Sequence, residues 1–292
     1  MTGLVIFGGL RRIANITDKI VPVMALLYLG VGIVIVAMNI ENVPGMVVAI
    51  VRDAFTPNSV TGAAVGTVIL LGVKRGMFSN EAGLGSAPNA GASAAVTHPV
   101  KQGLVQSLGV YFDTMIVCSI TAFIILSATP DLRGAGEGIA LTQNAMINNL
   151  GPWAGVLLAV IIFLLAFSSI LGNYYYGQSN IEFITGENRV ALTTYRVLAL
   201  LAVLGGALAS ASLVWTIADQ IMGVMALINL IALALLSGVA FKMLKSYTDQ
   251  YRRGEDPIFT VEEFAPKGDV SFWQDEEQVT GYPPKGAPAR RR

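Results

Sequence analysis

The stretch of residues 72–90, GVKRGMFSNEAGLGSAPNA, constrains the fold of this chain more than any other. It follows a run of apolar and small residues (63–72) that is typical of a membrane-embedded helix, yet it places Lys74, Arg75 and Glu81 among several glycines. A simple spanning helix tolerates neither the charges nor the breaks. Glycine-interrupted hydrophobic segments with polar groups are typical of transporter binding sites, where unwound backbone binds ions and zwitterions. The alternative is a helix that ends at Gly72 and is followed by a polar loop.

The composition indicates a protein with several membrane spans. Hydrophobic residues make up 54% of the chain and charged residues 13%, and the mean hydropathy is +0.63. A soluble domain is closer to about a quarter charged. The formal net charge is zero, with 19 basic and 19 acidic side chains, so no nucleic-acid partner is expected. The single cysteine, Cys118, excludes an intramolecular disulfide bond and a cysteine-based metal cluster.

Six segments are candidates for spanning helices, each of which needs about 20 predominantly apolar residues. The last is longer than one span requires, so it is either one tilted helix or a helix kinked near Gly223. From Ser246 the composition changes to that of a soluble tail, which we expect to be disordered or loosely membrane-associated. The six segments comprise residues 20–39, 62–78, 104–128, 153–176, 190–210 and 213–244.

The basic residues between these spans predict the orientation of the chain. Alternating the sides of the membrane through six spans places most of them on one face and mainly Arg52 and Arg133 on the other. Because cytoplasmic loops carry the excess of lysine and arginine, the first face and the C-terminal tail are predicted to be cytoplasmic. The basic residues of that face are Arg11, Arg12, Lys19, Lys101, Arg189, Arg196, Lys242 and Lys245.

Several motifs, in the same order along the chain, resemble those of the alanine/glycine:cation symporter family. The most specific is RGMFSNEAGLGSAP at residues 75–88, and the others are GGLRRIA (8–14), HPVKQG (98–103), FDT (112–114), AFSSILGNYYYG (166–177) and WTIAD (215–219). The resemblance implies an all-α polytopic membrane protein of the LeuT-like fold. The glycine-rich break GTGNIAG of the family's first substrate helix does not occur here, so the chain resembles the C-terminal part of a symporter.

The expected organisation is therefore a partial transporter domain at residues 1–247 and a cytoplasmic tail at residues 248–292. The transporter domain would form the second half of a LeuT-like bundle with a discontinuous helix. We expect the discontinuity between Gly66 and Asn80, since each glycine lowers helix stability by up to about 1 kcal/mol relative to alanine.

The resemblance implies that residues 62–87 form the sixth core helix and its continuation, which binds substrate. For Arg75 and its neighbour Lys74, snorkelling to the lipid surface is preferred to substrate contact. Glu81, with Ser79, would begin the following half-helix by satisfying free N–H groups. The residues expected near the substrate are Thr67, Leu71, Gly72, Met77 and Phe78.

A second group of candidate residues lies in the span at residues 153–176. Ser168 and Ser169 are adjacent in an otherwise aliphatic run, where an isolated serine usually donates to a carbonyl one turn earlier. As a pair, together with the carbonyl of Leu165, they would instead direct three oxygens at one sodium ion, which prefers oxygen ligands. The resemblance implies that this pair lies in the eighth core helix, where LeuT-like symporters hold sodium. Sodium is thus the expected coupling ion, and no other cofactor is expected.

Asp113 is an acidic residue inside the span at residues 104–128. Such a residue is either functional or paired with a neighbouring helix, and we expect it to pair with Arg75 or Lys74 in preference to coordinating an ion. Arg75, Glu81 and Asp113 are therefore assigned structural or gating roles. Asp219, in the last span, invites the same interpretation.

The resemblance implies sodium-coupled symport of a small neutral amino acid, alanine or glycine, by alternating access. The alternatives are a polytopic channel or receptor, whose polar residues would repeat along one face of several helices, and a remnant that does not transport. The expected location is the lipid bilayer of the plasma membrane, which is the inner membrane in a bacterium. Nothing supports an enzyme, because the chain has one histidine and neither a nucleophile elbow nor a phosphate loop.

Overall fold

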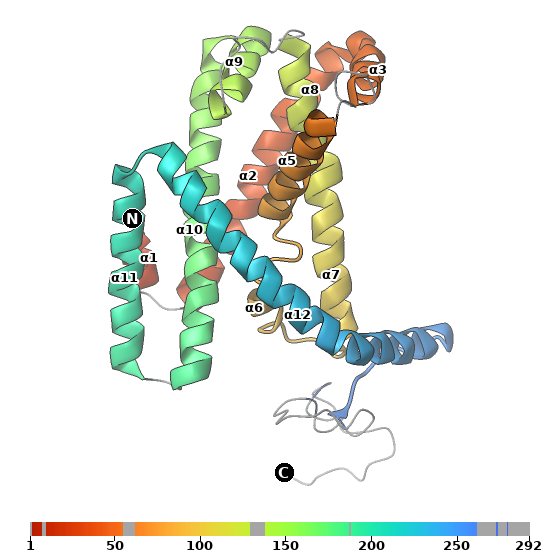
Figure 1. Ribbon diagram of the computed structural model, residues 1–292, viewed down its shortest axis with the longest axis vertical. Coiled ribbons are helices and arrows are strands. Elements are labelled where there is room, and N and C mark those ends of the chain that lie inside the picture. The colour runs from red at the N-terminus through yellow and green to blue at the C-terminus, as the bar shows by residue number, and fades with distance from the viewer. Residues whose placement is uncertain are drawn as a thin grey trace. The chain divides into compact units, whose positions relative to one another are not determined.

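The computed structural model describes residues 2–7, 10–54, 62–128, 138–186, 188–261, 273 and 279. All regular structure within these ranges is helical, in agreement with the expected all-α class (Figure 1). Five of the described helices are long and apolar enough to cross a membrane, as in a multi-pass membrane protein. They comprise Ile16–Met38, Pro99–Ala128, Pro152–Thr185, Arg189–Leu208 and Ala211–Arg252. The expected span at residues 62–78 forms a helix but is not among these five.

The chain divides into two compact units, which are described separately. Unit 1 consists of Met1–Glu81 and Tyr111–Ile221, and unit 2 of Ala82–Val110 and Met222–Arg292. Unit 1 contains α1 (Thr2–Ile6), α2 (Leu10–Met38), the short 3-10 helix η1 (Ile40–Asn42), α3 (Val43–Ala54), α5 (Gly62–Asn80), the π-helix η2 (Phe112–Cys118), α8 (Ser119–Ala128), α9 (Ile139–Leu150), α10 (Pro152–Thr185), α11 (Arg189–Leu208) and the first part of α12 (Ala211–Arg252).

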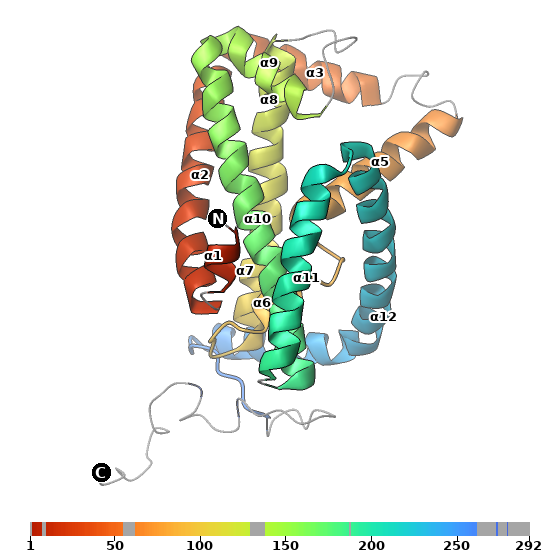
Figure 2. The same cartoon turned by 90° about the vertical axis from the view of Figure 1, so that its left-hand side faces the viewer.

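The core of unit 1 lies where α2, α8, α9 and α10 meet (Figure 2). Ile35, Ile124 and Met146 are completely buried there, one from each of α2, α8 and α9. The helices α2 and α8 come very close at Gly32. A methyl group added there would lie 2.2 Å from Ile120 Cγ2. Small residues that allow such close approach are typical of helix pairs in membranes, where lipid supplies no hydrophobic drive for association.

The two ends of unit 1 carry different members of the basic set from which the orientation is predicted. The start of α2 and the connection between α10 and α11 lie at one end, and α3 and α9 lie at the other (Figures 1 and 2). Arg189 begins α11 at the first end, while Arg52 belongs to α3 at the opposite end. The cytoplasmic assignment of the first end stays a prediction from the excess of basic residues.

The helix break lies further along the chain than the sequence indicates. Helix α5 is continuous from Gly62 to Asn80, so the expected unwinding between Gly66 and Asn80 is wrong. Methyl groups added to Gly72 and Gly76 would meet no atom within 4 Å. No neighbour therefore packs tightly enough against these positions to stabilise an unwound backbone there. The chain leaves the helix at Glu81, whose φ is 54°, and Gly83 and Gly85 follow with φ of 83° and 86°. This left-handed region favours glycine.

Unit 2 contains α6 (Ala87–Gly91), most of α7 (Pro99–Tyr111) and the rest of α12. Asn229 of α12 donates a hydrogen bond of 3.0 Å to the carbonyl of Gly83 and so holds the turn before α6. Helix α12 continues to Arg252, past the expected end of the span at residue 244. It bends in its blue part, which lies beyond Gly223 (Figures 1 and 2). Within the described part of the tail, Phe259 is 3% exposed.

His98, the first residue of the HPVKQG motif, is completely buried in unit 2. It immediately precedes α7, and its Nδ1 accepts a hydrogen bond of 3.2 Å from the backbone N–H of Val100. Its Nε2 has no hydrogen-bond partner among the described residues. The ring of His98 therefore acts as a cap for the first turn of α7 while it packs in an aromatic environment.

Replacing Gly32 with alanine should destabilise the protein, because the new methyl group would collide with Ile120. Ile120 is β-branched, so its side chain has little rotamer freedom to move away. We expect a loss of about 1–3 kcal/mol, as is usual for overpacking, measured as a lower thermal midpoint in detergent. Gly30→Ala is the control on the same helix, since its methyl group would meet no atom within 4 Å. Equal midpoints for the two variants would contradict the close packing of α2 on α8.

The burial of His98 predicts its titration. Removal from water, and secondarily the charge of Lys101, lower the pKa of His98 from 6.5 to about 4. The fold therefore favours the neutral ring, so the stability that this group contributes is complete above pH 6.5 and is lost as the pH falls toward 4. His98 is the one histidine of the chain, so NMR of a histidine-labelled sample follows a single imidazole. We expect a midpoint near pH 4, and a midpoint near 6.5 would show that the ring is solvated.

Candidate functional site

The last turns of α5 contact the part of α12 that belongs to unit 1. Lys74 Nζ lies 2.5 Å from Asp219 Oδ2. The guanidinium carbon of Arg75 lies 4.4 Å from the centre of the Trp215 ring, and Phe78 packs on the same ring at 4.9 Å between centroids. Positions 74, 75 and 78 are three and four residues apart and so share one face of the helix. This face of α5 therefore presents a cationic and aromatic surface to α12.

The ion pair on this face is unevenly solvated. The Asp219 side chain is 17% exposed and that of Lys74 is 38% exposed. Asp219 Oδ1 is buried and has no hydrogen-bond partner among the described side and main chains. The pairing expected for Asp219 is thus present, and its partner is Lys74. Lys74 reaches a carboxylate on another helix, which differs from the expected snorkelling to the lipid surface.

The π-helix η2 carries the acid that the sequence singled out. Asp113 Oδ2 accepts a hydrogen bond of 2.6 Å from the hydroxyl of Ser79, and Thr114 Oγ1 accepts one of 3.2 Å from Asn80 Nδ2. The expected ion pairs of Asp113 with Arg75 or Lys74 do not form, since those side chains face Trp215 and Asp219. A π-helical turn shifts the helical register by one residue and is frequent at functional sites. Here it places two successive polar side chains against the end of α5.

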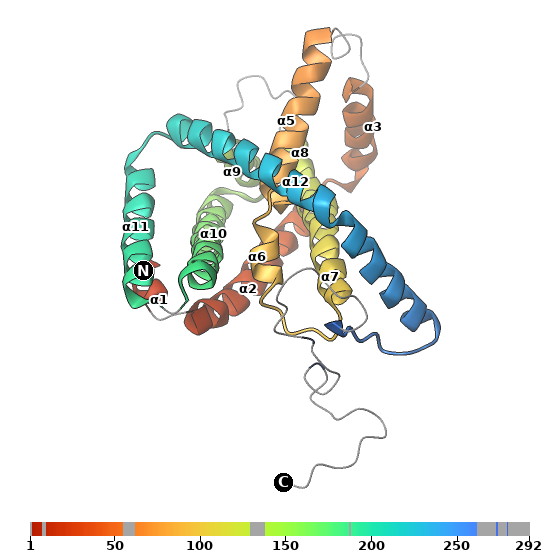
Figure 3. The ribbon, with the colours of Figure 1, turned by 60° about the horizontal axis from the view of Figure 1, so that its bottom comes forward.

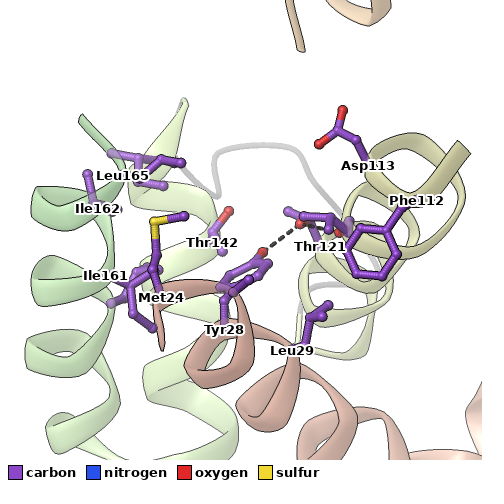
Figure 4. A pocket seen from close by; sticks show the side chains of 14 residues that line it. Met24, Tyr28, Leu29, Phe112, Asp113, Thr121, Thr142, Ile161, Ile162 and Leu165 are labelled. Atoms are coloured by element: carbon purple, nitrogen blue, oxygen red, sulfur yellow. Dashed lines mark hydrogen bonds between the residues drawn. The ribbon is translucent and has the colours of Figure 1, made fainter. Parts of the chain in front are cut away.

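A cavity of about 340 Å³ lies beside η2, between α2, α8, α9 and α10. Figure 4 shows Phe112 and Asp113 on one side of it and the aliphatic side chains of α10, including Leu165, on the other. Its lining is mostly apolar, with Asp113 and Thr142 among the few polar groups. A mostly apolar cavity with a few placed polar groups is the usual form of a small-molecule site.

The Tyr28 hydroxyl lies 2.5 Å from the Thr121 hydroxyl inside this cavity (Figure 4). Thr121 donates its own proton to the carbonyl of Val117 at 2.9 Å, so Tyr28 is the donor of the pair. The pair joins α2 to α8 and orients two hydroxyl groups in an apolar surrounding. Neither residue stands out in the sequence, because a single tyrosine or threonine in an apolar span has no distinctive spacing.

The residues expected near the substrate lie on more than one face of α5. Of these, Phe78 has a defined aromatic partner in Trp215. The Leu71 side chain is 49% exposed, Gly72 is open on its side-chain face, and Met77 is half-buried. Thr67 belongs to α5, but its side chain lies outside the described residues. None of the other four lines the cavity beside η2.

The expected sodium ligands lie on α10. Ser168 is buried, and its hydroxyl donates a hydrogen bond of 2.9 Å to the carbonyl of Leu165. This is the back-bonding geometry that was the alternative for an isolated serine. Ser169 is exposed, so the two hydroxyl groups lie in different surroundings. Leu165, whose carbonyl is the third expected sodium ligand, also lines the cavity beside η2.

Two partners were missed at the sequence level, Tyr176 for Glu81 and Asn229 for the turn that follows it. Glu81, expected to begin a half-helix, instead adopts a positive φ and is hydrogen-bonded to the hydroxyl of Tyr176 on α10. Asn229 of unit 2 stands alone among aliphatic residues of α12, where an unpaired amide is costly. Its isolation within an apolar run is a signal that could have identified it.

Interrupted apolar helices with paired polar groups are typical of secondary transporters. Comparison with known families agrees with this class and specifies it. The chain matches the model of the sodium:alanine symporter family over residues 1–261, and it belongs to that family.

Several relatives share this sequence at high identity. The chain is 47% identical over 280 residues to the amino-acid carrier protein AlsT of Bacillus subtilis, which covers 95% of this chain and 59% of AlsT. It is 44% identical over 271 residues to the probable sodium/glutamine symporter GlnT of the same organism, with 93% and 56% covered. It is 42% identical over 252 residues to the sodium/alanine symporter AgcS of Methanococcus maripaludis, with 85% and 55% covered. The chain thus spans somewhat more than half the length of these relatives.

The ion pair between α5 and α12 predicts a specific pattern of stabilities. Lys74→Met leaves the Asp219 carboxylate without its cation, which should cost about 1–3 kcal/mol because the pair is only partly buried. The double variant Lys74→Met/Asp219→Asn removes both charges and should recover part of that loss. Thermal midpoints in detergent measure both effects. A double variant that loses the full sum of the two single losses would show that the charges do not interact.

Proposed function

We propose that this chain provides the C-terminal part of a sodium-coupled symporter for small neutral amino acids. The transport would proceed by alternating access in a LeuT-like bundle, in which the chain supplies the second half. Family membership supports the proposal, as do the names of AlsT, GlnT and AgcS, which describe amino-acid carriers or symporters. The tail and the connection at residues 80–102 would lie in the cytoplasm, as the basic residues predict.

One structural observation carries this proposal. A helix end and a π-helical turn adjoin in unit 1, where Ser79 and Asn80 at the end of α5 bind Asp113 and Thr114 of η2. Beyond Asn80 the chain takes a positive φ at Glu81 and becomes non-helical. Interrupted helices with polar groups at membrane depth are the usual location of substrate and ion sites in secondary transporters. A channel would instead be expected to repeat polar residues along one face of several helices.

The substrate would be a small amino acid that lies against the end of α5. Phe78, whose ring packs at a tilt of 59° against Trp215, would form an apolar wall of its site, with Leu71, Gly72, Met77 and Thr67 on the same helix. The cavity of about 340 Å³ beside η2, at the lower end of the range of about 300–1,000 Å³ for ligand sites, is a separate space, since Leu71, Gly72, Met77 and Phe78 do not line it. Because the names of GlnT and AgcS specify glutamine and alanine, both are tested together with glycine.

Sodium would bind on α10 between the two serines and the carbonyl of Leu165. In the described geometry Ser168 donates to that carbonyl, and the oxygen lone pairs of Ser168 stay available to a cation. Ser169 is exposed and would turn its hydroxyl to the same ion. The structural or gating roles expected for three further residues would rest on one contact each. Arg75 contacts Trp215, Glu81 contacts Tyr176, and Asp113 contacts Ser79.

Uptake into proteoliposomes tests the proposed function. The chain is examined alone and joined behind the N-terminal part of AlsT that it does not match, with radiolabelled alanine, glycine or glutamine. We expect the joined protein to accumulate at least one of them under an inward sodium gradient and not under an equal potassium gradient. Flux without accumulation would favour a channel, and a folded protein without any flux would favour a remnant.

The sodium site has its own prediction. Replacing Ser168 and Ser169 together by alanine should raise the sodium concentration for half-maximal uptake by about tenfold, which corresponds to a loss of about 1.4 kcal/mol of binding. Alanine favours the helix, so folding should be preserved.

Ser237→Ala is the matched control for this variant. Ser237 donates to the carbonyl of Ala234 three residues earlier, as Ser168 does to that of Leu165, but it lies on α12. Its loss should leave the sodium dependence unchanged. If the double serine variant behaves like this control, both hydroxyls only bond to their own helix and the sodium assignment is wrong.

A further inference from the structure

The chain turns back on itself after α12. Gly254 has a φ of 77°, and its N–H donates to the carbonyl of Tyr251 at 3.0 Å, which closes the helix. Residues 256–261 then return along unit 2 together with Trp273, and we call these residues the strap. Figure 3 shows the blue chain leaving the end of α12 and approaching the start of α7.

The strap is fixed first to the last turns of α12. The side-chain amide of Gln250 donates to the carbonyl of Ile258 and accepts from its N–H, each at 2.9 Å. A side chain that satisfies both main-chain groups of one residue acts as a neighbouring strand would. This pair of hydrogen bonds sets the position of the strap along α12.

The strap is also fixed to the segment that precedes α7. The Phe259 N–H donates to the carbonyl of Thr97 at 2.9 Å, and Trp273 Nε1–H donates to the carbonyl of Val96 at 3.1 Å. The Thr97 hydroxyl donates back to the carbonyl of Pro257 at 3.1 Å. Three hydrogen bonds in both directions therefore join the strap to residues 96–97.

An aromatic cluster seals this contact. The Phe259 ring lies 5.6 Å from the His98 ring, and Tyr247 of α12 lies 5.2 Å from it, both edge-on. Trp273 packs edge-on against Phe259 at 5.7 Å. Phe259 is 3% exposed and His98 is completely buried, so the strap removes the cap of α7 from water.

A solvated ion pair lies at the edge of the strap. Lys101 Nζ lies 2.5 Å from Asp256 Oδ1 and 2.6 Å from the Thr97 hydroxyl. The Asp256 side chain is 76% exposed, so this pair is screened by salt and contributes little to the hold. The buried anchor is the aromatic cluster, which makes Phe259 the residue to test.

The strap is the main described link between the start of α7 and the end of α12. Direct packing between these two helices is sparse, in contrast to the close packing of α2, α8 and α10 in unit 1. A short segment with one buried anchor can therefore restrain two helices that hold each other weakly. Its release would leave both helices free to move apart while each keeps its own backbone hydrogen bonds.

We propose that the strap is an autoinhibitory element, which ties α7 to α12 and slows the conformational step of transport. Conformational steps limit the rate of many proteins that open and close around a ligand. The effect on transport rests on the proposed function, whereas the docking of the strap does not. The test therefore measures the docking of the strap and its effect on transport separately.

Phe259→Ala removes the anchor, and Phe241→Ala is the control, an exposed aromatic residue on α12 outside the strap. His98→Asn is a second variant, because asparagine can still accept from the N–H two residues on but lacks the ring. NMR of the single histidine reads docking: in Phe259→Ala the pKa of His98 should return from about 4 toward 6.5, and in Phe241→Ala it should not.

Uptake by the same variants, in the joined protein, reads autoinhibition. Phe259→Ala and His98→Asn should each raise the maximal rate of uptake by about tenfold. This corresponds to a strap that stabilises the ground state by about 1.4 kcal/mol. The half-saturating substrate concentration should be unchanged. An unchanged or lower rate per amount of folded protein would overturn autoinhibition. An unchanged pKa of His98 in Phe259→Ala would overturn the strap itself. Absence of uptake in every protein, the unaltered one included, would refute the proposed function and the inhibitory role with it.

Discussion

Polar side chains inside apolar helices need partners, and the arrangement around α5 depends on this constraint. An unsatisfied polar group in the hydrocarbon region costs several kcal/mol, in the range of about 2–7 kcal/mol for amides and hydroxyls. The charge of Lys74 is compensated by Asp219 of α12, and the hydroxyl of Ser79 is bound by Asp113 of η2. These two contacts join two different helices, α12 and η2, to the end of α5. The end of α5 is consequently a polar junction between helices, which explains why α5 differs from the five apolar spans.

The sequence was a good guide to helices and a poor guide to the position of the break. A long apolar run predicts a helix in almost any tertiary arrangement. Most ends of the spans were therefore predicted to within a few residues. Glycines in such runs are compatible with both a helix and a break, and only their surroundings decide. Gly72 and Gly76 are in open space and stay helical, whereas a methyl group added to Gly85 would lie 3.0 Å from Asn229, and Gly85 takes a positive φ. That distinction requires knowledge of α12, which is far away in the sequence.

Pairing of the intramembrane acids was predictable, but the identity of their partners was not. Asp219 pairs with Lys74, while Asp113, expected to pair with a cation, accepts from Ser79. The π-helix shifts the register at Asp113, and no composition rule predicts such a shift. The burial of His98 was missed for a similar reason, because it is covered by Phe259 from the other end of the sequence. The sodium and substrate residues stay predictions that rest on the family and on their positions in α5 and α10.

In the proposed function the amino acid on α5 and sodium on α10 bind to coupled sites, and linkage between the two ligands tests this most directly. A ligand that binds the folded state raises its stability, and coupled ligands strengthen each other's binding reciprocally. Thermal unfolding of the joined protein is measured with increasing alanine, glycine or glutamine, in sodium and in potassium at equal ionic strength. We predict that at least one amino acid raises the midpoint substantially in sodium and little in potassium. The same shift in both salts, or no shift in either, would contradict the account.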